Sequence, residues 1–324
     1  PEEPEELVSS HDWRARRATL REGKSLLQPW LAGGRWRDPM DSPAVSKTPG
    51  LAPGGVLGPL LAAHFASEKL DLPLLPTYAT QVVALCSDPS SDARSLAQLL
   101  QRDPSLAAHV LAIANSAAYA AREPIVSLQQ AIARMGVRTL AEIALSVAIK
   151  TKVFRAGAHV DRVQELWKHS AITAAWAREI ARSRRRSVES AFLCGLLHEV
   201  GAPVVLQAID DIQRKHKLEF SRGEIDAAIV QFHEELGERL VRGWALPEWT
   251  RAAAAFHHAP EMAPQFRDEV TTAHLADRMA HFLEGQDDLT GLDPILSALG
   301  MYEEDLEDLK AQADTIRGVA EALS

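Results

Sequence analysis

From Leu60 to the end of the chain, apolar residues recur at helical spacing in every long segment. No segment alternates apolar and polar residues between turn signals, which is the pattern of a half-buried strand. Residues 139–154 are apolar nearly all round, which predicts a buried central helix. Because an apolar helix face must be buried against another element, the sequence predicts an all-α protein of packed short helices.

Several helices carry start and stop signals. Polar residues suited to cap a helix N-terminus stand before three of them: Asp92, Asp103 and Ser127. Pro104 then occupies a first helical position, and Gly136 ends the helix that Ser127 begins. Ser221 and Glu224 have the spacing of a capping box. These signals predict where the helices begin and end.

The beginning of the chain differs from the rest. Between Gly33 and Gly58, prolines alternate with Gly, Ser and Thr, and each proline blocks continuation of a helix or ladder. We expect a Pro/Gly-rich N-terminal arm that Trp30 and Trp36 could dock onto the body. The predicted division is an arm (1–59), an N-terminal helical lobe (60–158), a second lobe (159–290) and a C-terminal extension of two short helices (291–324).

Composition narrows the class of protein. The net charge of −9 gives no general basic surface for nucleic acid, so nucleic-acid binding is not expected. No apolar run approaches the roughly 20 residues needed to span a bilayer, so no membrane segment is expected. Cys86 and Cys194 lie in apolar helical patterns, which indicates reduced core residues and a cytoplasmic protein. The basic run at Arg184, Arg185 and Arg186 reads first as a solvated loop, and alternatively as a phosphate or partner contact.

The stretch from Ala191 to Leu206 places His198 and Glu199 side by side within an apolar run, where they need a polar partner or a metal. Imidazole and carboxylate groups that converge from several helices are the ligands of borderline metals. Each such residue alone reads more simply as a hydrogen-bonded core or surface residue, so both readings stay open. The candidate ligands are His169, His198, Glu199, His233, His257, His258 and Asp277.

A series of short motifs resembles a known family. The chain from about Leu70 to Leu283 resembles an HDOD domain, and its second half is similar to the HD superfamily of metal-dependent phosphohydrolases. The matching motifs of the first half are Leu-Pro-x-Leu-Pro (72–76), Asp-Pro-Ser-Leu (103–106), Ala-Asn-Ser-Ala-x-Tyr (114–119) and Ser-Leu-x-x-Ala-Ile-x-x-Met-Gly (127–136). Those of the second half are Leu-Trp-x-His-Ser (166–170), Gly-Leu-Leu-His-Glu-Val-Gly (195–201), His-x-x-x-Gly (233–237), Trp-x-Leu-Pro (244–247), His257–His258 and Ala276–Asp277.

The resemblance implies an HDOD/HD-like helical bundle in two lobes, with a metal centre for iron, manganese or zinc in the second lobe. Two positions depart from the active HD pattern. Glu199 stands where active enzymes have Asp, and one extra methylene moves the carboxylate. Ala202 stands where related cyclic-dinucleotide phosphodiesterases have a Lys, which removes a cation for a substrate phosphate.

Three functions remain open. The first is a non-catalytic bacterial signal-transduction module that acts through protein partners or a bound ligand, with a partner surface around Asn115 and Tyr119. The second is a phosphohydrolase of nucleotides or cyclic dinucleotides, in which the metal would activate water. The third is nucleic-acid or scaffold binding through Arg182 and Arg184 to Arg186, or through the N-terminal arm. The departures at Glu199 and Ala202 favour the first.

Overall fold

The computed structural model describes residues 55–66, 72–87, 93–119, 124–154 and 157–323. Within these ranges the protein is helical and contains no strand, which confirms the predicted all-α class. The chain separates into two units, Pro1–Trp36 and Arg37–Ser324, and the described residues all lie in the second. Most of the predicted arm, including Trp30 and Trp36, lies outside the described residues, as do Asp92 and the side chain of Cys86.

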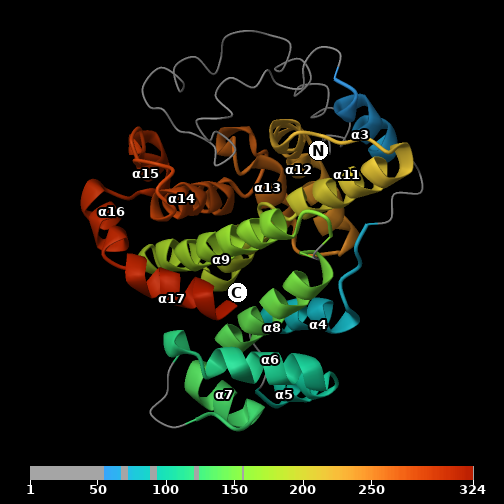
Figure 1. Ribbon diagram of the computed structural model, residues 1–324. Helices are drawn as coiled ribbons and strands as arrows, with labels where there is room; N and C mark the ends of the chain where they lie inside the picture. The colour runs from blue at the N-terminus through green and yellow to red at the C-terminus, as the bar shows by residue number, and fades with distance from the viewer. Residues whose placement is uncertain (1–54, 67–71, 88–92, 120–123, 155–156, 324) are drawn as a thin grey trace, which may run out of the picture. The chain divides into compact units, whose positions relative to one another are not determined.

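Helices α4 to α7 pack on one another and each contacts α8 (Figure 1). Their bounds are α4 Thr77–Ser87, α5 Ala93–Gln101, α6 Pro104–Ala114, α7 Leu128–Met135 and α8 Val137–Lys152. Residues 140–149 of α8 are all buried, so the predicted central helix is confirmed. Glu142 is also among them and requires a charged partner, which it finds in Arg178 at 3.8 Å.

The local signals act as expected. The Asp103 carboxylate accepts hydrogen bonds from the backbone N–H groups of Ser105 and Leu106, and Pro104 is the first residue of α6. Gly136 ends α7 at φ +85°, a conformation that L side chains rarely adopt. The capping box predicted at Ser221 opens a long helix, described next.

The second group of helices is organised around α9, Val160–Ser183. It packs most extensively on α10 and α14, and its Trp176 side chain is fully buried. The remaining bounds are α10 Val188–Leu197, α11 Ala202–His216, α12 Arg222–Gly243, α13 Glu248–Phe256 and α14 Arg267–Leu283. Because α9 contacts α10, α11 and α14, it forms the scaffold on which the functional residues are placed.

Helix α3, Leu57–Ala66, packs on α11 and α12 rather than on α4 to α8. The Arg239 guanidinium of α12 donates to the carbonyl oxygen of Phe65 at 2.9 Å, and the Phe65 ring meets Phe232 edge to face. The arm boundary expected after residue 59 falls inside this helix. The division into lobes remains a prediction.

The end of the chain forms three short helices, so the expectation of two is wrong. They are α15 Asp293–Leu299, α16 Glu303–Lys310 and α17 Ala313–Leu323. Gly300 ends α15 at φ +64°, and the chain turns before α16 begins. Helix α17 returns to α9, where the indole N–H of Trp167 donates to the carbonyl oxygen of Leu323 at 3.0 Å. The extension is therefore part of the packed body.

One stretch of the described residues, Val188–His216, is long and apolar enough to cross a membrane by length and composition alone. Such a stretch was not expected from the sequence. It joins α10 to α11 across the turn 198–201, and 94% of its most apolar window is buried within the protein. Such burial is typical of helices in a protein core. A single apolar stretch of this kind is weak evidence for a membrane span. Cys194, in the same stretch, is buried with a free thiol. The cytoplasmic location stays a prediction.

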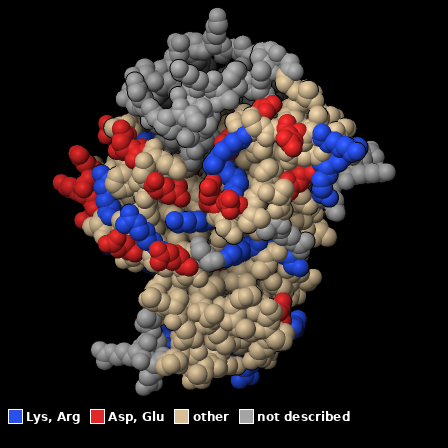
Figure 2. All heavy atoms as spheres, in the orientation of Figure 1, with Lys and Arg blue, Asp and Glu red and all other residues tan. Residues whose placement is uncertain are grey.

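Figure 2 shows acidic and basic side chains intermixed over the part of the surface that carries α9, α14 and α16. The part over α5, α6 and α7 is largely uncharged on the same face. No broad basic patch is visible on this face, in keeping with the net charge of −9.

Candidate metal centre

The turn 198–201 between α10 and α11 brings His198 and Glu199 to the centre of the second helical group. His198 is fully buried and directly follows α10. Gly201 packs against the carbonyl oxygen of His233 on α12, where no side chain would fit. This close approach of α11 and α12 places Glu199 beside the α12 histidine.

His169, His198 and Asp277 form a first cluster, which we call group one. The Asp277 Oδ1 lies 3.0 Å from His169 Nε2 and 3.6 Å from His198 Nε2. The two Nε2 atoms lie 3.3 Å apart. These side chains come from α9, from the turn after α10 and from α14, and all three are buried.

Glu199, His233, His257 and His258 form a second cluster, group two. The Glu199 Oε1 lies 3.4 Å from His233 Nε2, 3.5 Å from His257 Nε2 and 3.8 Å from His258 Nε2. The Nε2 of His233 is 3.4 Å and 3.2 Å from those of His257 and His258. The structure therefore brings all seven predicted ligands together, divided between the two groups.

Three of the histidines have their rings fixed by the helix turn that precedes them. The Nδ1–H groups of His198, His233 and His257 donate to the carbonyl oxygens of Gly195, Ile229 and Ala253, at 2.7, 2.9 and 3.1 Å. In the neutral ring each Nε2 is then an acceptor with a lone pair directed at the cluster. Backbone carbonyls orient metal-binding histidines in this way.

The Nε2 atoms face one another, and lone pairs in that arrangement repel unless a proton or a cation lies between them. Their separations of 3.2, 3.3 and 3.4 Å match the roughly 3.3 Å expected between two nitrogens bound at about 2.05 Å to one tetrahedral ion. The donors present therefore fit a divalent metal.

Two buried carboxylate oxygens support the same conclusion. Glu199 Oε2 and Asp277 Oδ2 accept no hydrogen bond within the described part of the chain. A buried acceptor without a partner costs free energy, and more so when it is charged. A bound cation would satisfy both oxygens.

The electrostatics keep the two carboxylates ionised. Burial alone would raise the pKa of Asp277, but the charge of His281 and the contacts with His169 and His198 hold it well below its usual value. Burial also opposes ionisation of Glu199, and His233 and His257 lower its pKa well below the usual value.

His258 is affected in the opposite sense, because burial and then the charges of His257 and His233 lower its pKa well below the usual value. Its ring is therefore neutral near pH 7, which is the form that binds a metal. His258, at 24% exposure of its side chain, is the most accessible of the candidate ligands.

Two further residues of the centre are absent from the predicted ligand set. His281 Nε2 lies 3.1 Å from Asp277 Oδ1, and Glu284 Oε2 lies 3.2 Å from His169 Nδ1. Asp277, His281 and Glu284 follow one another at spacings of four and three residues on one face of α14. That spacing was the available sequence signal.

The three arginines predicted for a partner surface differ in their exposure and contacts. Arg184 has 8% of its side chain exposed; it pairs with Asp268 and donates to the carbonyl oxygen of Leu299 at 2.8 Å. Arg185 and Arg186 are exposed. A partner contact therefore stays a prediction for these two, while Arg184 joins α9 to α14 and α15.

Asn115 and Tyr119 also have structural contacts. The Asn115 amide donates to the carbonyl oxygens of Leu111 and Ile125 and accepts from the N–H of Ile125, at 2.9, 2.8 and 2.7 Å. Tyr119 is half-buried and hydrogen-bonds to Arg178. Asn115 thus closes the loop after α6, and a partner role for the pair remains untested.

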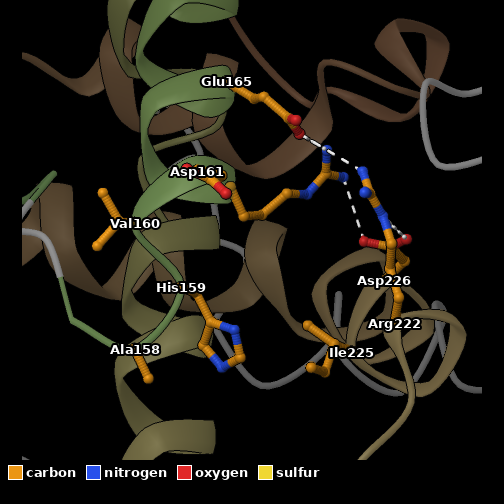
Figure 3. Close-up of a pocket in the computed structure, with 9 residues that line it drawn as sticks. Ala158, His159, Val160, Asp161, Glu165, Arg222, Ile225 and Asp226 are labelled. Atoms are coloured by element: carbon orange, nitrogen blue, oxygen red, sulfur yellow. Dashed lines mark hydrogen bonds and ion pairs between the residues drawn. The ribbon is translucent and has the colours of Figure 1, made fainter.

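A separate pocket of about 300 Å³ lies at the first turns of α9 and α12 (Figure 3). Arg162 pairs with Glu165 at 2.8 Å and with Asp226 at 3.3 Å, and Arg222 reaches Glu165 at 3.6 Å. The two guanidinium charges are therefore balanced by two carboxylates. The pocket has no surplus positive charge with which to attract a phosphate.

An all-helical body with a buried histidine–carboxylate centre defines the class of this protein. Within that class, residues 72–260 match the HDOD domain, and this match covers more than half of the chain. The chain belongs to the HDOD family.

Solved structures share the fold. An HDOD domain protein of unknown function from Geobacter sulfurreducens is 24% identical with a TM-score of 0.62, covering 82% of this chain and 97% of its own. A protein from Marinobacter aquaeolei, provisionally described as a signal transduction protein, is 23% identical with a TM-score of 0.63, covering 78% and 60%. One from Shewanella amazonensis, provisionally described as a metal-dependent phosphohydrolase, is 21% identical with a TM-score of 0.61, covering 83% and 98%.

A curated relative from Treponema pallidum, an uncharacterized protein, is 24% identical over 241 residues. The match covers 70% of this chain and 45% of the relative, so the chain spans about half the length of that protein.

Proposed function

We propose that this protein is a signal-transduction module of the HDOD type whose histidine–carboxylate centre binds a divalent metal as a structural or ligand-sensing element. The observation that carries the proposal is the set of facing Nε2 atoms at 3.2 to 3.4 Å within a buried cluster. Iron, manganese and zinc are the metals whose ligand preferences suit imidazole with carboxylate.

Burial argues for regulation rather than turnover. His198 and His257 have no exposed side-chain surface, and Asp277 has 1%. A catalytic metal needs an open coordination position that substrate can reach. Ala202, itself fully buried, supplies no cation for a substrate phosphate.

In this proposal, group one and group two each provide a site for the metal, and the helices that carry them transmit the occupied state to protein partners. Group one joins α9 to α14, and group two joins the turn before α11 to α12 and to the end of α13 through Glu199 and its three imidazoles. Binding between elements so far apart in sequence stabilises their packed arrangement relative to the separated one. Signalling proteins are the expected partners.

The test is the metal content of protein purified without added metal and without a histidine tag. We expect near-stoichiometric metal in the wild-type protein and a lower metal content in a variant with His198→Ala and Asp277→Ala, which lacks two ligands of group one. The same preparations would be assayed for hydrolysis of nucleotides and cyclic dinucleotides. Robust metal-dependent hydrolysis would contradict the regulatory assignment, and the absence of metal from a folded wild-type protein would contradict the metal centre.

The second candidate is a metal-dependent phosphohydrolase acting on nucleotides or cyclic dinucleotides. It is favoured by the adjacency of His198 and Glu199, which places the two ligand groups side by side as in two-metal sites. The Shewanella protein described above carries a provisional description of that kind. A metal held there would supply an activated water, and the group-two histidines would orient the carboxylate of Glu199. Hydrolysis that His198→Ala abolishes would establish this candidate in place of the first.

A further inference from the structure

Group one has a support built from the end of α14, with His281 in the last turn and Glu284 directly after it. We propose that Glu284 and His281 are positioning residues, which hold His169 and Asp277 in the arrangement that binds a metal. This inference rests on the proposed metal centre and adds two residues that neither the motifs nor the family assign.

The first step concerns His169. The Nδ1 atoms of His198, His233 and His257 all donate to backbone carbonyls of the preceding turn. His169 differs, because its Nδ1 lies 3.2 Å from the carboxylate oxygen Oε2 of Glu284. A carboxylate that accepts from a ligating histidine fixes the tautomer and makes the other nitrogen a stronger ligand. Glu284 therefore sets His169 to present Nε2 to group one.

The second step concerns Asp277. His281 Nε2 lies 3.1 Å from the Oδ1 of Asp277, while Asp277 Oδ2 accepts no hydrogen bond in the described part of the chain. A donor on Oδ1, the oxygen that also faces His169 and His198, restricts rotation of the carboxylate and keeps it directed at group one. The His281 side chain has 2% exposure, so water does not compete for this contact.

The third step separates a positioning role from direct ligation. The His281 ring stacks on the His169 ring, with centroids 4.5 Å apart and planes at 19°. The lone pair of an imidazole nitrogen lies in the ring plane, so two nearly parallel, offset rings cannot both direct Nε2 at one ion. His169 therefore acts as the ligand, and His281 acts through Asp277.

The same pair is tied together by Glu284. Its Oε2 lies 3.7 Å from His281 Nδ1 as well as 3.2 Å from His169 Nδ1. One carboxylate thus contacts both stacked rings on their outer nitrogens. The contacts of Glu284 with His169 and of His281 with Asp277 are made to members of group one, so their loss should weaken group one selectively.

The experiment is a Co²⁺ titration of metal-free full-length protein, followed by equilibrium dialysis for stoichiometry and by the visible Co²⁺ spectrum for ligand geometry. The variants are Glu284→Ala, Glu284→Gln and His281→Gln. The exposed Glu303→Gln on α16 is the control for loss of a carboxylate, and His258→Ala is the reciprocal control in group two.

We expect Glu284→Ala to lower affinity at one of two sites by about 10- to 100-fold while the other site stays unchanged. Glu284→Gln, which keeps an acceptor oxygen, should recover part of that loss, and His281→Gln should alter the Co²⁺ spectrum of the weakened site. His258→Ala should affect the other site instead. A purely structural role would lower both affinities together and would not give this selectivity.

Several outcomes would overturn the inference. Wild-type affinity at both sites in Glu284→Ala and His281→Gln would show that the pair does not position the ligands while leaving the metal centre intact. If Glu284→Ala fails to fold, the nearly isosteric Glu284→Gln decides, and unchanged affinity together with an unchanged spectrum there would reject the role of the carboxylate. A folded wild-type protein that binds no Co²⁺ would reject the metal centre itself and this inference with it.

Discussion

Gly201 and the carbonyl oxygen of His233 lie so close that a Cβ added to Gly201 would stand 2.0 Å from that oxygen. The same Cβ would meet the backbone nitrogen of Gly237 at 2.6 Å. Both contacts are with backbone, which cannot rotate aside as a side chain can. The approach of α11 to α12, and with it the place of Glu199 beside His233, therefore depends on glycine at this position.

We expect Gly201→Ala to destabilise the protein by roughly 2 to 4 kcal/mol, because the helices must separate to admit the methyl group. The measurement is urea unfolding followed by circular dichroism. Gly243→Ala at the end of α12 is the matched control, since a Cβ there meets nothing within 4 Å. The control should be neutral or stabilising by up to about 1 kcal/mol. Equal stability of the two variants would contradict the packing argument.

Removal of metal should lower thermal stability. A ligand that binds only the folded state stabilises it by about 2.7 kcal/mol when its concentration is 100 times the dissociation constant. We therefore expect the melting temperature to fall by several degrees when a chelator is added, and to recover with Mn²⁺, Fe²⁺ or Zn²⁺. The variant with His198→Ala and Asp277→Ala, which lacks two ligands of group one, should show a smaller chelator effect. A chelator effect of wild-type size in that variant would place the metal elsewhere.

Glu142 predicts a dependence of stability on pH. Burial raises its pKa from 4.5 to about 7, although Arg178 at 3.8 Å acts to lower it. Between pH 4.5 and 7 the folded state therefore binds more protons at this site than the unfolded chain, so its contribution to stability falls as pH rises. Ionisation of Glu142 should lower the free energy of unfolding at pH 8, relative to pH 4, by roughly 3 kcal/mol at most.

Glu142→Gln removes the titration, so the difference in unfolding free energy between variant and wild type should shift in favour of the variant as pH rises. The comparison would be made by urea unfolding between pH 4 and 8, with chelator present to exclude metal effects on the histidines. A difference that does not change with pH would show that Glu142 keeps an ordinary pKa.

Substitutions of the three arginines after α9 should change the stability of the protein by different amounts. Arg184 has 8% exposure and contacts Asp268, Thr272 and the carbonyl oxygen of Leu299. Arg184→Met should cost roughly 2 kcal/mol because these hydrogen bonds to a charged group are lost. Arg185→Ala and Arg186→Ala, on exposed side chains, should each stay within about 0.5 kcal/mol. Thermal unfolding of the three variants tests this, and equal losses would contradict it.

Much of the fold followed from local patterns. Asp103, Ser127 and Ser221 cap helices where predicted, because a side chain that binds the N–H groups of its own next turn needs no distant partner. The tail was expected to form two helices, but Gly300 and the turn at Ala311 and Gln312 divide it into three. Arg184 read as part of a solvated loop because its acceptors, on α14 and at the end of α15, lie far along the chain.

By itself the sequence determined that the chain is helical, because helical spacing is a local property, and it supplied seven candidate ligands without deciding which of them lie inside. Tertiary structure decided the pairing: Glu199 faces His233, His257 and His258, whereas Asp277 faces His169 and His198. It also added Glu284, which reaches a histidine on α9 that lies 115 residues away. Such pairing depends on how distant helices approach, as at Gly201 and His233, and spacing within one helix carries no record of that approach.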